Sequence, residues 1–178
     1  MTLGILTAVP PLERPDLLAP PVAAAFANGV SFAGAGVAEI DPALADTTAF
    51  CERYRVGPQE SANCVVLAAR REGRSWYAAC VVFATTRADV NGLAKKALGA
   101  SKISFAAMDD AVAATAMEYG GITPIGLPAA WPLLVDAAVA STPLVVVGSG
   151  VRRSKLIVPG ALLAALPNAR VLDGLGRM

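Results

Sequence analysis

The sequence predicts an α/β (α+β) fold, with a mixed β-sheet surrounded by short helices. Hydrophobic residues make up 55% of the 178 residues and charged residues only 16%, which excludes a disordered chain. Short β-rich runs and short helical segments follow one another without a regular strand–helix–strand rhythm, and this pattern favours a mixed sheet. Neither an internal repeat nor an interdomain linker is visible, so residues 1–178 are predicted to form a single domain.

The strands are predicted from short β-rich or apolar runs, at residues 36–40, 62–69, 76–85, 101–106, 133–135, 144–147 and 155–158. The second and third runs are separated by the charged segment 70–74 and are expected to form a hairpin. The fifth and sixth runs are wholly apolar, which is typical of buried strands. Residues 170–172 are expected to close the fold.

Helices are predicted at residues 22–27, 41–55, 89–98, 108–117 and 159–166. Their ends carry recognisable signals. The first is expected to stop at Asn28-Gly29. The second begins with Asp41 as a capping residue, followed by Pro42 at the first helical position. The third ends at Gly99, a residue that readily takes the left-handed conformation found after helices.

The charge distribution and the cysteine content indicate which partners and which cellular compartment to expect. Residues 1–50 hold one base and five acids, a net charge of −4, and residues 51–178 hold fourteen bases and nine acids, a net charge of +5. This split is compatible with a mildly basic face or with an ordinary solvated surface. Three cysteines without a CxxC motif indicate a reducing compartment and argue against disulfides or zinc.

The N-terminal residues carry neither a basic region nor a full apolar stretch, so no signal peptide is expected. The longest uncharged run, residues 17–38, contains Pro20-Pro21 and three glycines, which argue against a membrane-spanning helix. We therefore expect a cytoplasmic protein that binds no membrane and no DNA.

The chain contains no histidine. Catalytic triads that use histidine, histidine-ligated metals and a histidine general base are therefore all excluded. If the protein is an enzyme, proton transfer has to come from carboxylates, lysine, water, the substrate or the backbone. Neither a cofactor nor a metal is expected.

The segment 118–128 (EYGGITPIGLP) is the most informative part of the sequence. Glycines allow the bare backbone to approach a partner closely, and prolines hold the loop on both sides. Backbone N–H groups in such a turn can bind a carbonyl or an anion. The alternative is a buried crossover with tight turns. Glu118 and Tyr119 flank the glycines and either line the mouth of a site or are solvated.

Several segments are similar to motifs of one known family. Residues 120–128 are similar to a GxxxP loop and its adjoining segment, and residues 95–106 to a "K-x-LGAKKV-x-A" segment. Residues 133–136 are similar to a "P-V-L-V-D" strand and residues 147–153 to a "G-x-G-x-R" turn. In this order, across about residues 51–175, they resemble the YbaK/EbsC-type aminoacyl-tRNA deacylases, whose superfamily supplies the editing domain of prolyl-tRNA synthetases. The first fifty residues carry no such similarity.

The resemblance implies a trans-editing hydrolase that cleaves the ester between a wrong amino acid and the 3′ end of a transfer RNA. Small amino acids need such a second sieve, because one missing methylene is worth only about 1–3 kcal/mol of discrimination. The partners it implies are aminoacyl-tRNA and an aminoacyl-tRNA synthetase. The implied pocket consists of Asn63, Gly120, Gly121, Thr123, Pro124 and Asp136. The implied RNA contacts are Lys95, Lys96, Lys102, Ser149, Gly150, Arg152, Arg153 and Lys155.

One position departs from the family pattern. Many family members carry a lysine at the start of the strand, at the position that is Asn63 here. An uncharged amide cannot stabilise a developing oxyanion as a lysine does. Three interpretations follow: Asn63 has a related positioning role, another base such as Lys102 or Lys155 reaches the pocket, or the protein has become a weakened or inactive module that binds tRNA or an aminoacyl ligand. A hydrolase for another small aminoacyl ester is a further, weaker possibility.

Three other features have two interpretations each. Cys64 is a nucleophile only if a cation or a helix N-terminus activates it, and is otherwise a small buried residue. Asp136 either orders water in the pocket or caps the alanine-rich segment that follows. Gly148-Ser149-Gly150 lacks the third glycine of a dinucleotide fingerprint, so the basic residues after it fit phosphate contacts or a solvated turn.

Overall fold

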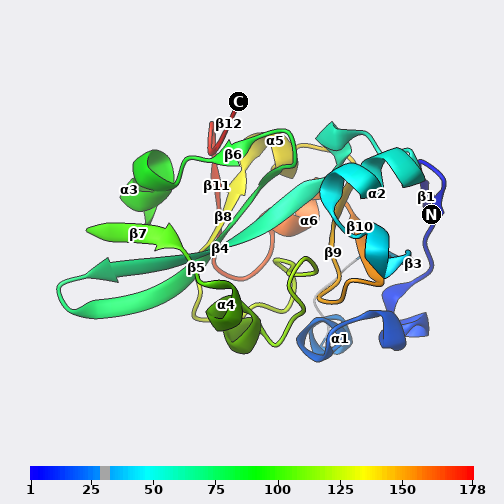
Figure 1. The fold of residues 1–178 in the computed structure, drawn as a ribbon, viewed down its shortest axis with the longest axis horizontal. Helices are drawn as coiled ribbons and strands as arrows, with labels where there is room; N and C mark the ends of the chain where they lie inside the picture. The colour runs from blue at the N-terminus through cyan, green and yellow to red at the C-terminus, as the bar shows by residue number, and fades with distance from the viewer. Residues whose placement is uncertain (29–32) are drawn as a thin grey trace.

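The computed structural model describes residues 1–28 and 33–178. Its larger sheet has five strands, in the order β11 (Ala169–Leu172), β8 (Leu133–Asp136), β5 (Arg74–Phe83), β4 (Ala62–Arg71) and β7 (Lys102–Phe105) (Figure 1). β4 runs antiparallel to both β5 and β7, whereas β8 is parallel to β5 and to β11. The mixed sheet predicted from the sequence is therefore confirmed.

The second sheet is antiparallel and has three strands, in the order β3 (Gly36–Glu39), β10 (Ser154–Val158) and β9 (Val145–Gly148). It meets the larger sheet at a parallel bridge between Ser61 and Val146. Two short pairs complete the strands: β1 (Thr2–Leu3) with β2 (Leu6–Thr7), and β6 (Arg87–Ala88) with β12 (Gly176–Arg177).

The predicted hairpin is formed by β4 and β5, which project at one end of the long axis of the molecule (Figure 1). Arg71 pairs with Arg74, so the connecting turn contains only Glu72 and Gly73. Both turn residues have positive φ, 50° and 79°. Two-residue turns of this kind match the twist of the flanking strands. The charged segment 70–74 is therefore largely strand, and the strands are longer than predicted.

Six α-helices lie around the sheets among the described residues: α1 (Pro20–Ala27), α2 (Thr47–Tyr54), α3 (Lys95–Leu98), α4 (Met108–Thr115), α5 (Ala137–Ala140) and α6 (Gly160–Ala164). The predicted stop signal Gly29 lies outside the described residues. Among the helices described, none is long and apolar enough to cross a membrane.

The single helix predicted over residues 41–55 is wrong. Asp41 does act as a cap, because its side chain accepts from the Ala43 N–H at 2.9 Å, but the helix that it starts is the short 3₁₀ turn Pro42–Leu44. Asp46 is extended, with ψ of 139°, and α2 begins after it. An extended residue interrupts the backbone hydrogen bonds of a helix, so the segment divides in two.

The helix predicted over residues 89–98 begins with a π-helical turn, Val90–Ala94. Asp89 caps this turn by accepting from the Leu93 N–H at 2.8 Å, and α3 follows to Gly99, which is left-handed with φ of 63°. The glycine stop was predicted correctly. The π-helical turn was not predicted, because the sequence signals of a helix do not distinguish π-helical from α-helical hydrogen bonding.

The main hydrophobic core lies between the two sheets and is covered by α1 and α6. It joins Val81 and Val135 of the larger sheet to Val145 and Val158 of the smaller one. A second cluster surrounds Phe50 of α2, and a third lies on the opposite face of the larger sheet. Beyond their bridge the two sheets separate, and residues of both line one cavity.

Candidate functional site

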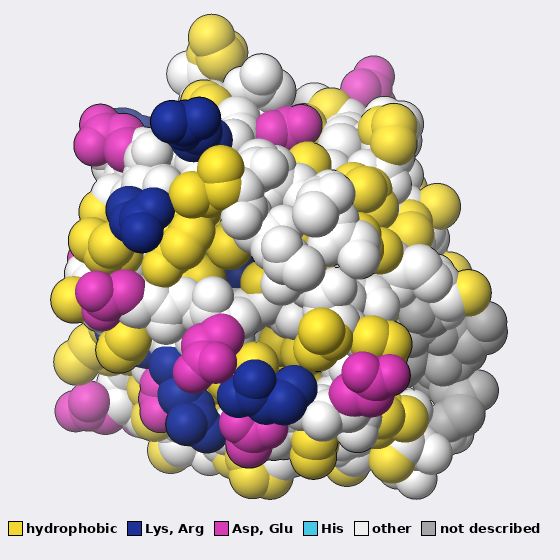
Figure 2. Space-filling view, turned by 90° about the vertical axis from the view of Figure 1, so that its right-hand side faces the viewer, with side chains coloured by type: hydrophobic (Ala, Val, Ile, Leu, Met, Phe, Trp, Pro, Cys, Tyr) yellow, Lys and Arg dark blue, Asp and Glu magenta, His cyan; other side chains and the backbone are white. Residues whose placement is uncertain are grey.

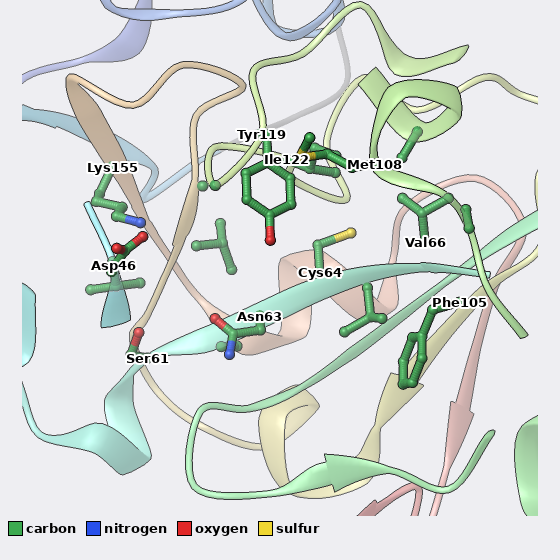
Figure 3. A pocket seen from close by; sticks show the side chains of 18 residues that line it. Asp46, Ser61, Asn63, Cys64, Val66, Phe105, Met108, Tyr119, Ile122 and Lys155 are labelled. Atoms are coloured by element: carbon green, nitrogen blue, oxygen red, sulfur yellow. The ribbon is translucent and has the colours of Figure 1, made fainter. Parts of the chain in front are cut away.

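A cavity of about 430 Å³ opens where the two sheets separate. β7 pairs with β4 from Leu67 onward, so the preceding part of β4 presents an unpaired edge to the cavity within the described residues. The other walls come from β9, β10, the glycine loop and the start of α4 (Figure 3). The lining residues are Asp46, Ser61, Ala62, Asn63, Cys64, Val65, Val66, Phe105, Ala106, Met108, Ala111, Tyr119, Gly120, Ile122, Val146, Val147, Gly148 and Lys155.

The unpaired edge of β4 contributes backbone groups. The Val66 carbonyl accepts from the Ala106 N–H at 2.9 Å, so the backbone polar groups of Val66 point away from β5. Residues two apart in a strand direct these groups to the same edge. The N–H and C=O of Cys64 therefore face the cavity and can recognise a carbonyl oxygen and an amine.

The glycine loop is joined by hydrogen bonds to the turn after β9. The Gly121 carbonyl accepts from the Gly150 N–H at 2.8 Å, and the Gly150 carbonyl accepts from the Glu118 N–H at 2.8 Å. The Glu118 carboxylate accepts from the Arg152 N–H at 2.6 Å. Two segments far apart in the sequence thus hold each other in place, and the loop is a preformed wall of the cavity.

Close backbone contacts explain the glycines in this loop. A Cβ at Gly121 would lie 2.8 Å from the backbone of Val151, and one at Gly148 would lie 2.2 Å from the Gly121 carbonyl oxygen. Gly120 lines the cavity and is left-handed, with φ of 81°. Gly121 lies behind it and lets the loop approach the turn. Of the two predicted glycines, Gly120 lines the cavity and Gly121 supports the loop from behind.

Lys155, considered from the sequence both as an RNA contact and as a base that reaches the pocket, lines the cavity from β10 (Figure 3). Its ammonium donates to the Ala45 carbonyl at 3.0 Å and lies 5.3 Å from the centre of the Phe50 ring. Burial, reinforced by the nearby Arg152 guanidinium, lowers the pKa of Lys155 to about 8. Asp46, beside it in Figure 3, acts in the opposite direction. The cavity therefore contains a half-buried cation.

Asn63 lines the cavity from β4, as predicted, and is accessible to solvent. Its side-chain oxygen accepts from the Thr47 hydroxyl at 3.2 Å, which orients the amide. Tyr119 extends over the cavity toward Asn63 and Cys64 (Figure 3). With Phe105 and Met108 it forms an exposed apolar rim, since these three side chains are 62%, 62% and 52% exposed. Such a rim suits a planar base or an apolar group.

Thr123, Pro124 and Asp136 do not line the cavity. Thr123 is fully buried, and its hydroxyl has no hydrogen-bond partner among the described residues. Pro124 lines a separate cavity of about 120 Å³ on the other side of the loop. Asp136 caps α5 by accepting from the Ala138 N–H at 2.8 Å, and its second oxygen accepts from the Gly176 N–H at 2.7 Å. Asp136 was expected either to order water in the pocket or to cap the following helix, and in the structure it caps the helix.

The residues predicted as RNA contacts after β9 are engaged within the protein. Ser149 is fully buried and bonds the Ser154 hydroxyl at 2.7 Å, while a Cβ at Gly150 would clash with Ala19. Arg152 pairs with Asp46 at 3.5 Å and donates to the Pro42 carbonyl at 3.2 Å. The Arg153 guanidinium donates to the Asp16 carbonyl.

Charged side chains on one end of the molecule are mixed in sign. In Figure 2, basic side chains lie beside acidic ones, and no broad patch of a single sign is visible. Ion pairs between Arg14 and both Asp16 and Glu39, at 2.8 and 3.3 Å, are of this kind. The predicted basic face is therefore not on this side. Lys95, Lys96 and Lys102 lie elsewhere, in α3 and at the start of β7.

The cysteine environments do not favour a nucleophile. Burial raises the pKa of the Cys64 thiol well above its ordinary value, and the neighbouring Cys80 adds to this. Burial also raises the pKa of Cys80 to about 12 and that of Cys51 above its usual range. A thiolate is therefore disfavoured at all three positions, and Cys64 contributes backbone and apolar surface.

Three cavity residues, Asp46, Phe105 and Met108, carry no signal in the sequence that points to a site. Asp46 lies far from the glycine loop along the chain, whereas Phe105 and Met108 shortly precede it. Phe105 and Met108 lie in ordinary β and helical patterns, and an exposed aspartate before a helix normally serves as a cap. Only the three-dimensional arrangement brings them to the cavity.

Residues 41–166 match the family described as the aminoacyl-tRNA editing domain. Among solved structures, a candidate trans-editing enzyme for prolyl-tRNA synthetase has a TM-score of 0.75 and 21% sequence identity, covering 90% of this chain and 97% of that chain. The hypothetical protein APE2540 has a TM-score of 0.70 and 20% identity, covering 79% of this chain and 90% of that chain. No curated protein sequence matches this chain.

At these identities the two structural similarities show a shared fold. The family match is more specific, because it spans the β4 edge, the glycine loop and Lys155. It covers well over half of the sequence, and the motifs that resemble the family in the sequence lie largely within it. The chain belongs to the aminoacyl-tRNA editing domain family.

Proposed function

We propose that this protein is a trans-editing hydrolase that removes a wrongly attached amino acid from the 3′ end of a transfer RNA. The observation that carries the proposal is the convergence in one cavity of a free strand edge, the glycine loop and the Lys155 ammonium. Membership of the editing domain family supports an aminoacyl ester as the substrate.

The reaction needs only water. The oxygen of a water molecule adds to the ester carbonyl carbon, and the bond from this carbon to the ribose oxygen then breaks. Water supplies the hydroxyl of the released acid and the proton of the ribose hydroxyl. Negative charge develops on the carbonyl oxygen in the transition state, so a fixed donor or cation at that point accelerates the reaction.

In this proposal Lys155 provides the charge that Asn63 lacks. The family lysine would project from β4, whereas here the cation projects from β10 on another wall of the same cavity. Lys155 stabilises the oxyanion, Asn63 orients the ester or the terminal ribose through its amide, and the Gly120 backbone closes the site. Lys102, the other base considered from the sequence, does not line this cavity and has no role in the chemistry.

The test is deacylation of a panel of mischarged transfer RNAs, with alanine, serine and cysteine on non-cognate acceptors that include proline acceptors. Lys155→Met should lower kcat/KM by about 100-fold or more, the effect typical of losing one oxyanion-stabilising group. Adding Asn63→Lys to this variant should restore part of the rate, because it returns a cation to the cavity from β4. Arg87→Met, an exposed change in β6, is the control.

The outcomes separate the alternatives. Equal activity of Lys155→Met and the wild type would refute the role of Lys155. If the wild type releases no amino acid across the panel but still binds transfer RNA, the chain is a binding module of the same fold. If it cleaves small aminoacyl esters but binds no transfer RNA, it is a hydrolase of another substrate.

A further inference from the structure

The projecting end of the β4–β5 hairpin, together with β7 and α3, concentrates positive charge. Residues 68–77 and 95–104 contain six bases and one acid, a net charge of +5. The rest of the chain contains nine bases and thirteen acids, a net charge of −4. We call this region the basic end; its bases are Arg70, Arg71, Arg74, Lys95, Lys96 and Lys102. It lies opposite the smaller sheet along the long axis (Figure 1).

Most of the charged groups of the basic end are accessible to solvent. All of its bases are exposed except Lys95, which is half-buried. Arg71 is engaged within the basic end: it pairs with Glu72 at 3.1 Å and donates to the Gly99 carbonyl at 3.3 Å. Arg152, Arg153 and Lys155 likewise donate to carbonyl groups of the protein.

One face of the basic end combines basic and aromatic side chains. Residues directly opposite one another on neighbouring strands share a face of the sheet. Arg70 lies opposite Ser75 on β5 and Lys102 on β7, and the next row inward places Tyr77 and Ser104 on either side of Ala68. A groove of about 540 Å³ lies here, and its lining includes Arg70, Trp76, Tyr77 and Lys102. Arg70 and Lys102 therefore lie on the same face of the sheet as the Tyr77 ring.

This face is continuous with the catalytic cavity. Val66, Ala68 and Arg70 alternate along β4 and so project on the same side of the sheet. Val66 lines the cavity and Arg70 lines the groove. At the rise of an extended strand the two positions are about 13 Å apart.

We infer that the basic end binds the phosphate backbone of the acceptor end of transfer RNA while the cavity holds the aminoacyl ester. This inference rests on the proposed function and extends it to the partner surface. Arginine forms paired hydrogen bonds with phosphate oxygens, and Tyr77 offers a ring on which an unpaired base stacks. Tyr77 itself is supported by Trp131, with ring centres 5.2 Å apart.

The test compares two variants that each remove two positive charges. Arg70→Gln/Lys102→Gln changes the groove, and Arg53→Gln/Arg55→Gln changes the region of α2 at the opposite end. Circular dichroism verifies that both fold. Binding of uncharged transfer RNA is measured by fluorescence anisotropy between about 50 and 200 mM salt, a range in which phosphate binding is strongly salt-dependent.

The groove variant should bind at least about tenfold more weakly, and its log–log salt slope should fall by about 2, one unit for each phosphate that the protein no longer neutralises. The α2 variant should bind as the wild type does. Equal weakening in both variants would indicate attraction by net charge alone and would overturn the inference, as would unchanged affinity in the groove variant.

A second readout separates this inference from the proposed chemistry. The groove variant should hydrolyse an aminoacyl ester of adenosine at the wild-type rate while its kcat/KM on full-length substrate falls. Absence of hydrolysis by every form, with groove-dependent binding intact, would refute the chemistry and leave the binding surface. Normal hydrolysis of the small ester without groove-dependent binding would refute the surface alone.

Discussion

The position of the Lys155 side chain reduces the stability of the folded protein. The side chain is half-buried, and burial lowers its pKa to about 8 from an ordinary value of 10.5. Below pH 8 the group is charged in both the folded and the unfolded protein, so the desolvation cost is present in full. Between these two values the folded protein loses the proton first, and the free energy of unfolding should rise with pH.

Lys155→Met should remove this cost. We expect the variant to raise the free energy of unfolding at about pH 7 by about 1 kcal/mol, and to lose the rise in stability between pH 8 and 10.5. Urea unfolding of both proteins at about pH 7 and about pH 9.5 measures this. A variant that is both less stable at pH 7 and fully active would contradict the function assigned to Lys155.

Other residues show why a side chain's role depends on what it contacts. Asn63 and Gly120 line the cavity as predicted, whereas Thr123 and Pro124, within the same short motif as Gly120, point elsewhere. Neighbours in a loop project in different directions, so a motif identifies the loop but not which members face the site.

At the scale of elements, Asp136 joins three segments. It ends β8, caps α5 and accepts from Gly176 at the start of β12. Asp136→Ala should lower the free energy of unfolding by about 2 kcal/mol, because it removes a helix cap and leaves a second N–H without its acceptor. Urea unfolding provides the measurement, with the exposed change Asp173→Ala as the control.

The same variant distinguishes a structural role from a catalytic one. Asp136 lies outside the cavity, so the folded Asp136→Ala protein should keep the wild-type kcat/KM under conditions in which it remains native. Loss of activity without loss of stability would restore Asp136 to the site predicted from the sequence.

Elements were predictable where the signal is local. The hairpin follows from two β-rich runs around a short charged turn, and Gly99 ends its helix because glycine tolerates a positive φ. The prediction of one helix over residues 41–55 was wrong because both Asp41 and Asp46 can begin a helix. Tertiary contacts decide where the helix starts. Tyr54, for example, accepts from the Asp41 N–H at 2.8 Å and fixes the separation of the two turns.

At the scale of the whole molecule, the main core is shared by both sheets. We therefore expect residues 1–178 to unfold as one cooperative unit. Trp76 and Trp131 both report on the larger sheet, since Trp76 lies in β5 and the Trp131 ring packs at a tilt against Tyr77. Urea transitions followed by tryptophan fluorescence and by far-ultraviolet circular dichroism should coincide. Separate transitions would show that the smaller sheet unfolds independently.

The sequence by itself determined the mixed sheet, the hairpin, the glycine loop, the exclusion of histidine chemistry and the resemblance to the editing family. These properties depend on residue type, order and local spacing. Tertiary structure alone decided that Lys155 enters the cavity, that Arg152 and Arg153 are engaged within the protein, and that six bases gather at the hairpin end. The physical reason is that the cavity lies between strands paired across long sequence separations. Which side chains face it is therefore fixed by sheet register and by packing in the shared core.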